Sequence, residues 1–176
     1  LEKYQNMDSR KSMERERKRL EEKAYRYETY WRVLDRWLYL KESGRNMAGY
    51  LEEKGISYED VGCHGRESCD YPQFGRAVAN AVACGQCEKG IVICTTGIGI
   101  SIAANKVKGI RCALCADPLS ARMTRLHNDA NMLALGGGML GENLALDIVD
   151  TFLNTPFSEE EKHRRRIGAI EEPQEL

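Results

Sequence analysis

The stretch GIVICTTGIGISIAANK, residues 90–106, holds the densest group of residues that can do chemistry. A buried strand is expected to run into a glycine-rich turn, and the turn to open a helix at about Ser101. Gly97 and Gly99 lack a Cβ and let the backbone approach a ligand, and the free amides of the helix favour an anion. Cys94 ends the strand and faces the positive end of the helix, which favours a thiolate base or nucleophile. A small core cysteine is the other interpretation, and both stay open here.

A second group lies in RMTRLHNDAN, residues 122–131, where His127 ends an expected helix and Asn128 and Asp129 follow. One interpretation is an acid or base whose tautomer is set by a neighbour. The other is a histidine that satisfies the last carbonyls of its helix, with Asn and Asp building the turn. The residues alone do not separate the two.

A third group is the basic run KHRRR, residues 162–166. Such runs are usually solvated, and the acidic residues 159–161 just before it have the spacing to pair with it along a helix. A phosphate site would instead project one or two of these side chains toward the ligand, where arginine forms forked hydrogen bonds.

Two CxxC pairs, at residues 84–87 and 112–115, invite a zinc interpretation, which we reject. The second pair lies in an expected strand, where residues three apart point to opposite faces and do not share a metal. The first pair then lacks partner ligands. A thioredoxin-like redox role also fails, because Cys84 and Cys87 lie where a helix ends. We therefore expect no metal site.

Composition narrows the class of protein. The chain has 176 residues and a formal net charge of -1, which gives no global reason to expect nucleic acid or an acidic membrane as partner. No window approaches the run of about 18 apolar residues that spans a bilayer, and the first 19 residues are charged where a signal peptide is apolar. Seven cysteines, several inside apolar runs, argue against a disulfide framework. We expect a cytoplasmic protein.

The elements that must position these groups alternate along the chain. Helices are predicted at residues 47–54, 72–83, 101–107, 118–127, 142–153 and from Ser158, and strands at 56–61, 90–94, 109–115 and 132–135. Such alternation predicts βαβ units and a doubly wound, Rossmann-like parallel sheet flanked by helices. Ligands bind such sheets beyond the carboxyl ends of the strands.

The N-terminal region differs in its sequence pattern from the rest of the chain. Residues 9–42 combine a charged run with a heptad stripe, which predicts a long amphipathic helix. We favour a helix that packs on its own domain over a coiled-coil arm between subunits, because two heptads are not diagnostic. The chain is therefore divided into an atypical N-terminal segment, residues 1–46, and an α/β domain, residues 47–176.

Several motifs, taken in order, resemble the family of type B ribose-5-phosphate isomerases and galactose-6-phosphate isomerase subunits. The resemblance extends from about Met47 to Ile170, and several motifs in the right order are far more specific than any one of them. The matching stretches are Asp70-Tyr-Pro, the run at 90–106, Gly109-Ile-Arg-Cys-Ala-Leu, Ser120-Ala-Arg, His127-Asn-Asp-Ala-Asn and Ile148-Val-Asp-Thr-Phe-Leu.

The resemblance implies an aldose–ketose isomerase that acts on a small phosphorylated sugar, without metal or organic cofactor, as a homodimer with sites between subunits. It implies that Cys94 moves the proton between C2 and C1 of ribose 5-phosphate and ribulose 5-phosphate. Thr96 and the amides around Gly97, Gly99 and Ser101 are expected to stabilise the enediolate oxygen, because this chemistry needs a base and preorganised donors for a transient oxyanion.

The same resemblance implies the remaining site residues. His127 is expected to help open the furanose ring, with Asn128 on a sugar hydroxyl and Tyr71 also at the substrate. Lys162 and Arg166 are expected to hold the phosphate, from the partner subunit. The family usually has Arg at the position of Lys162, so a forked contact becomes a point charge here.

The largest departure from the family lies at the front. Family members begin with a central strand ending in Gly-x-Asp-His-Gly-Gly, and residues 1–46 do not match it, although Asp35 lies at about the right place. There are three explanations for the missing strand. Trp31–Leu40 is recruited as a strand in its place, or a helix covers the gap. The third is a frameshifted or mis-predicted gene start, which would make this segment foreign to the fold. Activity is expected to be impaired. The alternatives are a galactose-6-phosphate isomerase subunit and a degenerate, non-catalytic phosphosugar-binding paralogue.

Overall fold

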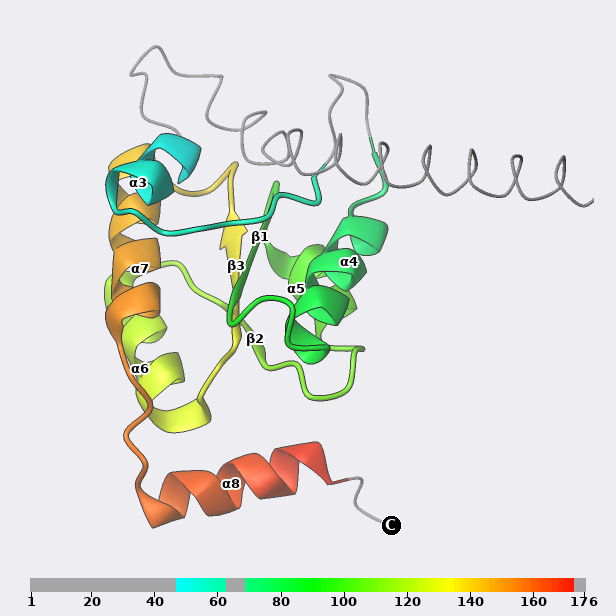
Figure 1. Cartoon of the computed structure of the whole chain (residues 1–176), viewed down its shortest axis with the longest axis vertical. Helices are drawn as coiled ribbons and strands as arrows, with labels where there is room; N and C mark the ends of the chain where they lie inside the picture. The colour runs from blue at the N-terminus through cyan, green and yellow to red at the C-terminus, as the bar shows by residue number, and fades with distance from the viewer. Residues whose placement is uncertain (1–46, 63–68, 173–176) are drawn as a thin grey trace, which may run out of the picture.

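The computed structural model describes residues 47–62 and 69–172 (Figure 1). The predicted helix over residues 9–42 and the candidate Asp35 lie outside these ranges. The helices are α3 (Met47–Glu53), α4 (Tyr71–Ala83), α5 (Ile98–Ala104), α6 (Pro118–Asn128), α7 (Glu142–Asn154) and α8 (Glu161–Glu171), and the strands are β1 (Gly90–Cys94), β2 (Cys112–Leu114) and β3 (Met132–Gly136). The predicted alternation of helices and strands is confirmed from α4 onward.

The described strands form one parallel sheet in the order β1-β3-β2. Gly90 pairs with Met132 and Cys94 with Gly136, so β1 and β3 run in register over their full length. All five residues of β3 are buried, as expected for a strand that has helices on both faces. The predicted Rossmann-like α/β class is therefore correct.

Figure 1 shows helices on both faces of the sheet, and an apolar layer lies between the sheet and the helices on each face. Side chains alternate along each strand, so Leu133 and Leu135 face α3, α6 and α7, whereas Met132 points into the layer with α4 and α5. Cys112 belongs to this second layer and Cys115 to the first. The prediction that these two thiols point to opposite faces is confirmed.

One predicted strand does not form and three predicted boundaries are wrong, one of them the start of the last helix, which lies at Glu161 and not at Ser158. Residues 56–61 form no strand, because no described segment runs beside them to supply a hydrogen-bonding partner. The helix after β1 begins at Ile98 and not at Ser101, since Gly97 adopts a left-handed conformation that serves as its cap. The strand expected over 109–115 is confined to Cys112–Leu114. Strand limits depend on partners distant in sequence, which local patterns do not report.

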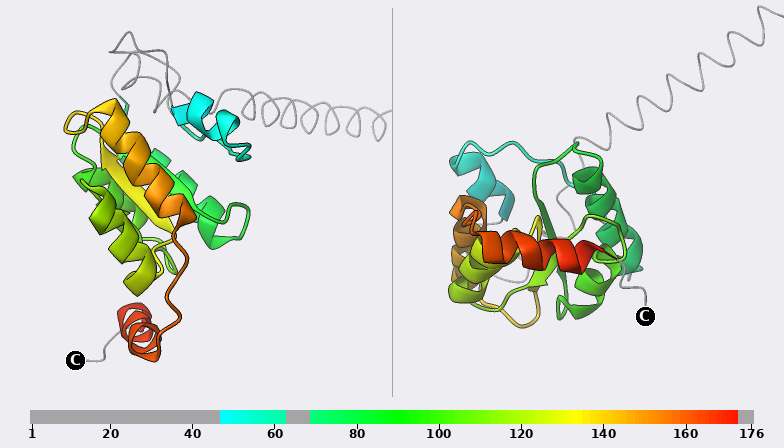
Figure 2. Two further views of the ribbon diagram at one scale, coloured as in Figure 1. Left: turned by 90° about the vertical axis from the view of Figure 1, so that its left-hand side faces the viewer. Right: turned by 90° about the horizontal axis from the view of Figure 1, so that it is seen from below.

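Helix α8 stands apart from the two layers. Figure 1 places it beyond the lower ends of the strands, and the view from below in Figure 2 shows it lying across them. It packs on α6, and the Ser158 amide donates a hydrogen bond to the Leu126 carbonyl at 3.2 Å just before it begins. Within the described ranges, no helix has both the length and the apolar character needed to cross a bilayer.

Candidate active site

Cys94 is the last residue of β1 and lies at the edge of the sheet where the strands end, which we call the carboxyl edge. The Gly97 amide donates a hydrogen bond to the Cys94 Sγ atom over 3.2 Å. The thiol is half-buried, and the two threonines that follow it are exposed. The Cys94 sulfur therefore lies in a loop that a ligand can reach, with a backbone amide directed at it.

Two glycines give this loop its shape. Gly97 has φ 76°, and a Cβ there would lie 2.8 Å from the Leu135 carbonyl carbon, so a side chain has neither the backbone conformation nor the room it needs. At Gly99 a Cβ would overlap the hydroxyl end of Tyr71. Tyr71 opens α4 and is exposed, so it covers the glycine turn from the solvent side. Four predicted site residues, Cys94, Gly97, Gly99 and Tyr71, thus lie together.

The turn after β3 supports the Cys94 loop. The Gly137 amide donates to the Cys94 carbonyl and the Gly138 amide to the Thr95 carbonyl, each over 2.8 Å. A Cβ at Gly136 would lie 2.8 Å from the Thr96 carbonyl oxygen, which explains a glycine at the end of the buried strand. The candidate base is therefore positioned by two loops and not by one.

The predicted hydrogen-bond donors of the loop differ in whether they already have an acceptor within the protein. The Ile98 amide donates to the Thr96 Oγ1 atom over 3.3 Å, and the Ser101 amide donates to the Gly97 carbonyl over 3.1 Å. Ser101 is buried and its hydroxyl donates to the Ile98 carbonyl over 2.8 Å. In the described part of the chain, the Gly99 amide has no such partner. The geometry therefore favours backbone near Gly99 over Ser101 as an anion donor.

His127 lies at the opposite edge of the sheet, which we call the amino edge. Helix α6 ends at Asn128, and β3 begins only four residues later at Met132, so His127 is near the starts of the strands. Its ring stacks on the ring of His163 from α8, with centroids 4.3 Å apart and planes 12° apart. His127 and Asn128 are exposed, whereas His163 is buried.

His163 is electrostatically unusual. Neither of its ring nitrogens has a hydrogen-bond partner among the described residues, and the Glu160 Oε1 atom lies 3.8 Å from its Nε2 atom. Burial lowers the pKa of His163, and His127, Lys162 and Arg166 lower it further, while Glu160 opposes them. The inner ring of the stack is therefore kept neutral, and it gives His127 a flat apolar support.

Two arginines that the sequence analysis did not single out build the amino edge. Arg111 donates from Nε to the Asn128 carbonyl over 2.8 Å and from Nη1 to Glu171 over 2.7 Å, which ties the end of α6 to α8. Arg125 is buried, and its Nη1 atom donates to Asp129 over 2.7 Å. In the sequence, the only indication of a role for Arg111 is its place in the Gly109-Ile-Arg motif. The burial of Arg125 depends on tertiary packing.

The predicted phosphate residues project from α8 at this same edge. Lys162 Nζ lies 2.7 Å from Glu160 Oε2, and both side chains are about half exposed. Arg166 is exposed and forms no ion pair with any described residue. The free guanidinium is the better placed of the two to receive an anion.

The predicted site residues therefore fall into two sets. Because β1 and β3 are parallel, their carboxyl ends share one edge, and the Cys94 set lies there. The His127 set lies beyond the starts of the same strands, where Figure 1 shows the lower end of α6 and α8. Within one copy of the chain these two sets do not form one pocket.

Cys112 and Cys115 of the second CxxC pair lie on opposite faces of the sheet. Across residues 47–62 and 69–172, no group of three or more His, Cys, Asp or Glu side chains is placed to hold a metal ion. Burial raises the pKa of Cys112 to about 12 and that of Cys115 to about 11, and each thiol packs in a different apolar layer. These two residues are core side chains.

Comparison with known proteins identifies the family. The family model described as Ribose/Galactose Isomerase matches residues 40–170. Ribose-5-phosphate isomerase B of Escherichia coli K12 is 45% identical over 124 residues, which is 70% of this chain and 83% of that protein. The galactose-6-phosphate isomerase subunit LacB of Clostridium acetobutylicum is 40% identical over 123 residues, which is 70% of this chain and 71% of that protein.

A solved structure agrees with this match. The ribose-5-phosphate isomerase B of Clostridium thermocellum superposes with a TM-score of 0.69 at 56% identity, covering 70% of this chain and 83% of that one. The motifs and the parallel sheet therefore have a common origin in these proteins. The chain belongs to the ribose/galactose isomerase family of sugar-phosphate isomerases.

Proposed function

We propose that the chain interconverts ribose 5-phosphate and ribulose 5-phosphate, with Cys94 as the base. The observation that carries this proposal is the hydrogen bond from the Gly97 amide to the Cys94 sulfur, in a loop that a ligand can reach. The thiolate takes the proton from C2 of the open-chain aldose, and the electron pair moves to the C1 oxygen to give an enediolate. The hydroxyl proton then moves from the C2 oxygen to the C1 oxygen, and returning the abstracted proton to C1 gives the ketose, so the step balances without an oxidant or reductant.

The other predicted residues are assigned roles that fit this step. Thr96 and the backbone near Gly99 stabilise the enediolate oxygen, because donors already in place need no reorganisation when charge develops. His127 transfers a proton during ring opening, with Asn128 on a sugar hydroxyl. The free guanidinium of Arg166 holds the phosphate.

We also propose that each site is completed by a second copy of the chain. Cys94 and His127 lie at opposite edges of the sheet, so a single copy brings only half of these residues to a sugar. Around the carboxyl edge, the apolar side chains of Ile98, Leu119 and Met139 are each more than half exposed. Large exposed apolar side chains gathered near one place are typical of an interface between subunits.

A mixing experiment tests the shared site. Cys94→Ala and His127→Ala variants are each expected to be inactive, and co-refolding them in equal amounts should restore about a quarter of the wild-type activity. Half of the dimers are then mixed, and each mixed dimer has one of its two sites intact. If Cys94 and His127 worked within one copy, mixing would restore nothing.

The substrate is tested by a coupled assay that compares ribose 5-phosphate with galactose 6-phosphate. The similarity to LacB makes the second sugar the alternative substrate. We expect turnover on ribose 5-phosphate below the roughly 10 per second typical of enzymes, because residues 1–46 lack a Gly-x-Asp-His-Gly-Gly strand end. Turnover of neither sugar would contradict the proposal and favour a non-catalytic phosphosugar-binding protein.

A further inference from the structure

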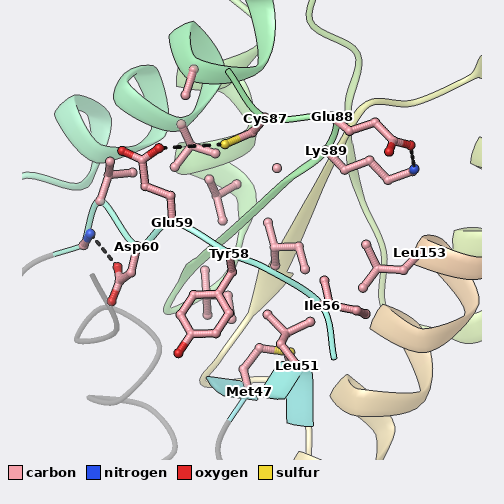
Figure 3. Close-up of a pocket in the computed structure, with 18 of the residues that line it drawn as sticks. Met47, Leu51, Ile56, Tyr58, Glu59, Asp60, Cys87, Glu88, Lys89 and Leu153 are labelled. Atoms are coloured by element: carbon pink, nitrogen blue, oxygen red, sulfur yellow. Dashed lines mark hydrogen bonds and ion pairs between the residues drawn. The ribbon is translucent and has the colours of Figure 1, made fainter. Parts of the chain in front are cut away.

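A cavity of about 670 Å³ lies along β1 and is lined chiefly by that strand, α4, the segment 56–62 and the side chains of Met47 and Leu51 (Figure 3). None of the predicted site residues lines it. Cys94 and His127 lie instead at the two edges of the sheet, on the last residue of β1 and in the last turn of α6. The position of His127 therefore depends on how the chain is held where α6 ends, and not on the wall of this cavity.

Asp129, directly after α6, has an uncommon backbone conformation. Its φ is 42° and its ψ is 46°, which is the left-handed region. Among the described residues other than glycine, only Glu159 shares a positive φ, at 59°. A side chain makes this conformation unfavourable, and aspartate and asparagine tolerate it best. The turn at Asp129 fixes the direction of the chain next to His127 and Asn128, so the contacts that hold this turn also place those two residues.

The Asp129 carboxylate is held by two arginines. The Arg125 Nη1 atom donates to Oδ1 over 2.7 Å, and the Arg111 Nη2 atom donates to Oδ2 over 3.2 Å. The two arginine side chains are only 9% and 18% exposed, so the charges meet in partly desolvated surroundings. Hydrogen bonds that involve charged groups are roughly twice as strong as neutral ones. Both carboxylate oxygens therefore take part in a clamp on the turn after α6.

Each arginine of this clamp is anchored to a second part of the fold. Arg125 also donates from Nε to the Thr155 carbonyl at the end of α7, over 3.1 Å. Arg111 also donates from Nη1 to Glu171 in the last turn of α8, over 2.7 Å. The Asp129 carboxylate thus links the turn after α6 to α7 and to α8.

Backbone contacts complete the clamp. The Arg111 Nε atom donates to the Asn128 carbonyl and its Nη2 atom to the Asp129 carbonyl, each over 2.8 Å. One guanidinium therefore holds two successive carbonyls, while the side chains of His127 and Asn128 stay exposed. A left-handed residue that only caps a helix needs its backbone conformation and no carboxylate. Two arginines on the carboxylate exceed what a cap requires.

We propose that Asp129 is a positioning residue for the reaction, which holds His127 and Asn128 where they meet the sugar. The proposal rests on the ring-opening role given to His127 above. Ring opening breaks the bond between C1 and the ring oxygen, and the electron pair goes to that oxygen. The ring oxygen gains a proton and the anomeric hydroxyl loses one, so the step balances. Because proton transfer needs donor and acceptor within hydrogen-bonding distance, a small movement of His127 slows it steeply.

Two measurements separate this role from a purely structural one. Ribulose 5-phosphate is open-chain, because the hydroxyl that could close a five-membered ring carries the phosphate. Exchange of its C1 hydrogen with deuterium from the solvent therefore requires the Cys94 step and not ring opening. Conversion of ribose 5-phosphate, which is largely cyclic, requires both.

Asp129→Gly keeps the left-handed conformation available and removes the carboxylate. It should lower kcat/KM for ribose 5-phosphate by about 10- to 100-fold, the scale expected for a misplaced catalytic group. Deuterium exchange at saturating ribulose 5-phosphate should change little. Asp129→Asn keeps one acceptor oxygen and should lie between the two proteins. Glu159→Gly is the matched control and should change neither measurement, because Glu159 also has a positive φ and pairs with an arginine, Arg164.

Wild-type conversion by Asp129→Gly would overturn the proposal, because Asp129 would then act only as a helix cap. Equal losses of conversion and of exchange would also overturn it, since the substitution would then act on the whole fold. If Asp129→Gly does not fold, Asp129→Asn is compared with the wild-type chain by the same two measurements.

The NMR signals of the His127 ring provide a readout that is independent of activity. Stacking on His163, with centroids 4.3 Å apart, places the His127 ring protons in the ring current of its neighbour, so their signals lie upfield of those of free histidine. They should move toward the free position in Asp129→Gly and stay in place in Glu159→Gly. Unchanged signals in Asp129→Gly would contradict the proposal even if conversion slowed. If the wild-type chain neither converts nor exchanges, the proposed function fails, and these signals alone decide whether Asp129 positions His127.

Discussion

The two edges of the sheet hold their candidate site residues with different kinds of chemical group. At the carboxyl edge, Cys94 is held by backbone amides and by glycines that leave room for close contact. At the amino edge, charged and aromatic side chains from α6 and α8 position His127. A transient charge on a reacting atom needs rigid dipoles close by, whereas a dianionic phosphate needs full charges that can reach it. In the proposed reaction, the carboxyl edge carries the proton transfer between carbons, and the amino edge carries ring opening and phosphate binding.

The largest expected effect on activity is that of Cys94→Ala at the carboxyl edge. Removing a general base costs about 10²- to 10⁴-fold in rate, so kcat for ribose 5-phosphate should fall by that factor. Thermal unfolding should change little, because the side chain is half-buried and alanine fits the same space. Cys84→Ala removes an exposed thiol at the end of α4 and is the control. Near-normal turnover of Cys94→Ala would exclude Cys94 from the reaction.

Substitutions at the amino edge are expected to weaken substrate binding more than they slow turnover. Arg166→Ala should raise KM by about 10- to 100-fold and change kcat little, because a phosphate is held alike in the ground and transition states. Arg164→Ala is the matched control, since that guanidinium already pairs with Glu159. Lys162→Arg should leave KM unchanged or lower it, because arginine forms a forked contact. Equal, small effects of Arg166→Ala and Arg164→Ala would make the run a solvated surface.

The rigidity of the carboxyl edge can be measured separately from catalysis. Gly97→Ala should lower the free energy of unfolding by about 1 to 3 kcal/mol, since it strains the backbone at φ 76° and presses on β3. Gly109→Ala has the same kind of backbone conformation, φ 79°, but no atom within 4 Å of the new Cβ. The difference between the two variants in chemical denaturation isolates the packing of the loop. A smaller loss of unfolding free energy in Gly97→Ala than in Gly109→Ala would mean that the loop moves to make room for the new Cβ.

The smallest expected effect is a pH dependence at the amino edge. Burial lowers the pKa of His163 in the folded chain, so the unfolded chain binds more protons once the pH falls below about 6.5. Stability should therefore decrease from pH 7 toward pH 5. His163→Phe retains a ring against His127 and removes this titration, so its urea midpoint should vary less over that range. Identical slopes for the two proteins would contradict a neutral, buried His163.

The central elements were predictable because they are local patterns. The buried run before Cys94 and the apolar run over 132–135 read as strands, and both are found as β1 and β3. The segment 56–61 has a similar pattern but forms no strand, because pairing requires a neighbour that the pattern does not supply. Secondary structure that depends on a distant partner is the part that a single sequence reports least well.

The candidate site was predictable in its residue types and less so in its construction. Cys94 and the glycines were visible because a strand, a glycine turn and a helix follow one another in sequence. His163 was not visible, because it lies in a basic run typical of a solvated helix, and its burial arises only when α8 crosses α6. The same holds for Arg111, whose contacts join residues 17 and 60 positions away.

The two hydrogen bonds that join the turn after β3 to the Cys94 loop limit how this protein can vary in evolution. Gly137 and Gly138 donate to the Cys94 and Thr95 carbonyls, so two segments more than 40 positions apart share one geometry. An insertion or deletion in either segment would shift the donors past their acceptors and misplace the thiol. We therefore expect the two loops to keep their lengths together among active relatives, while the surrounding helices and termini lengthen or shorten freely.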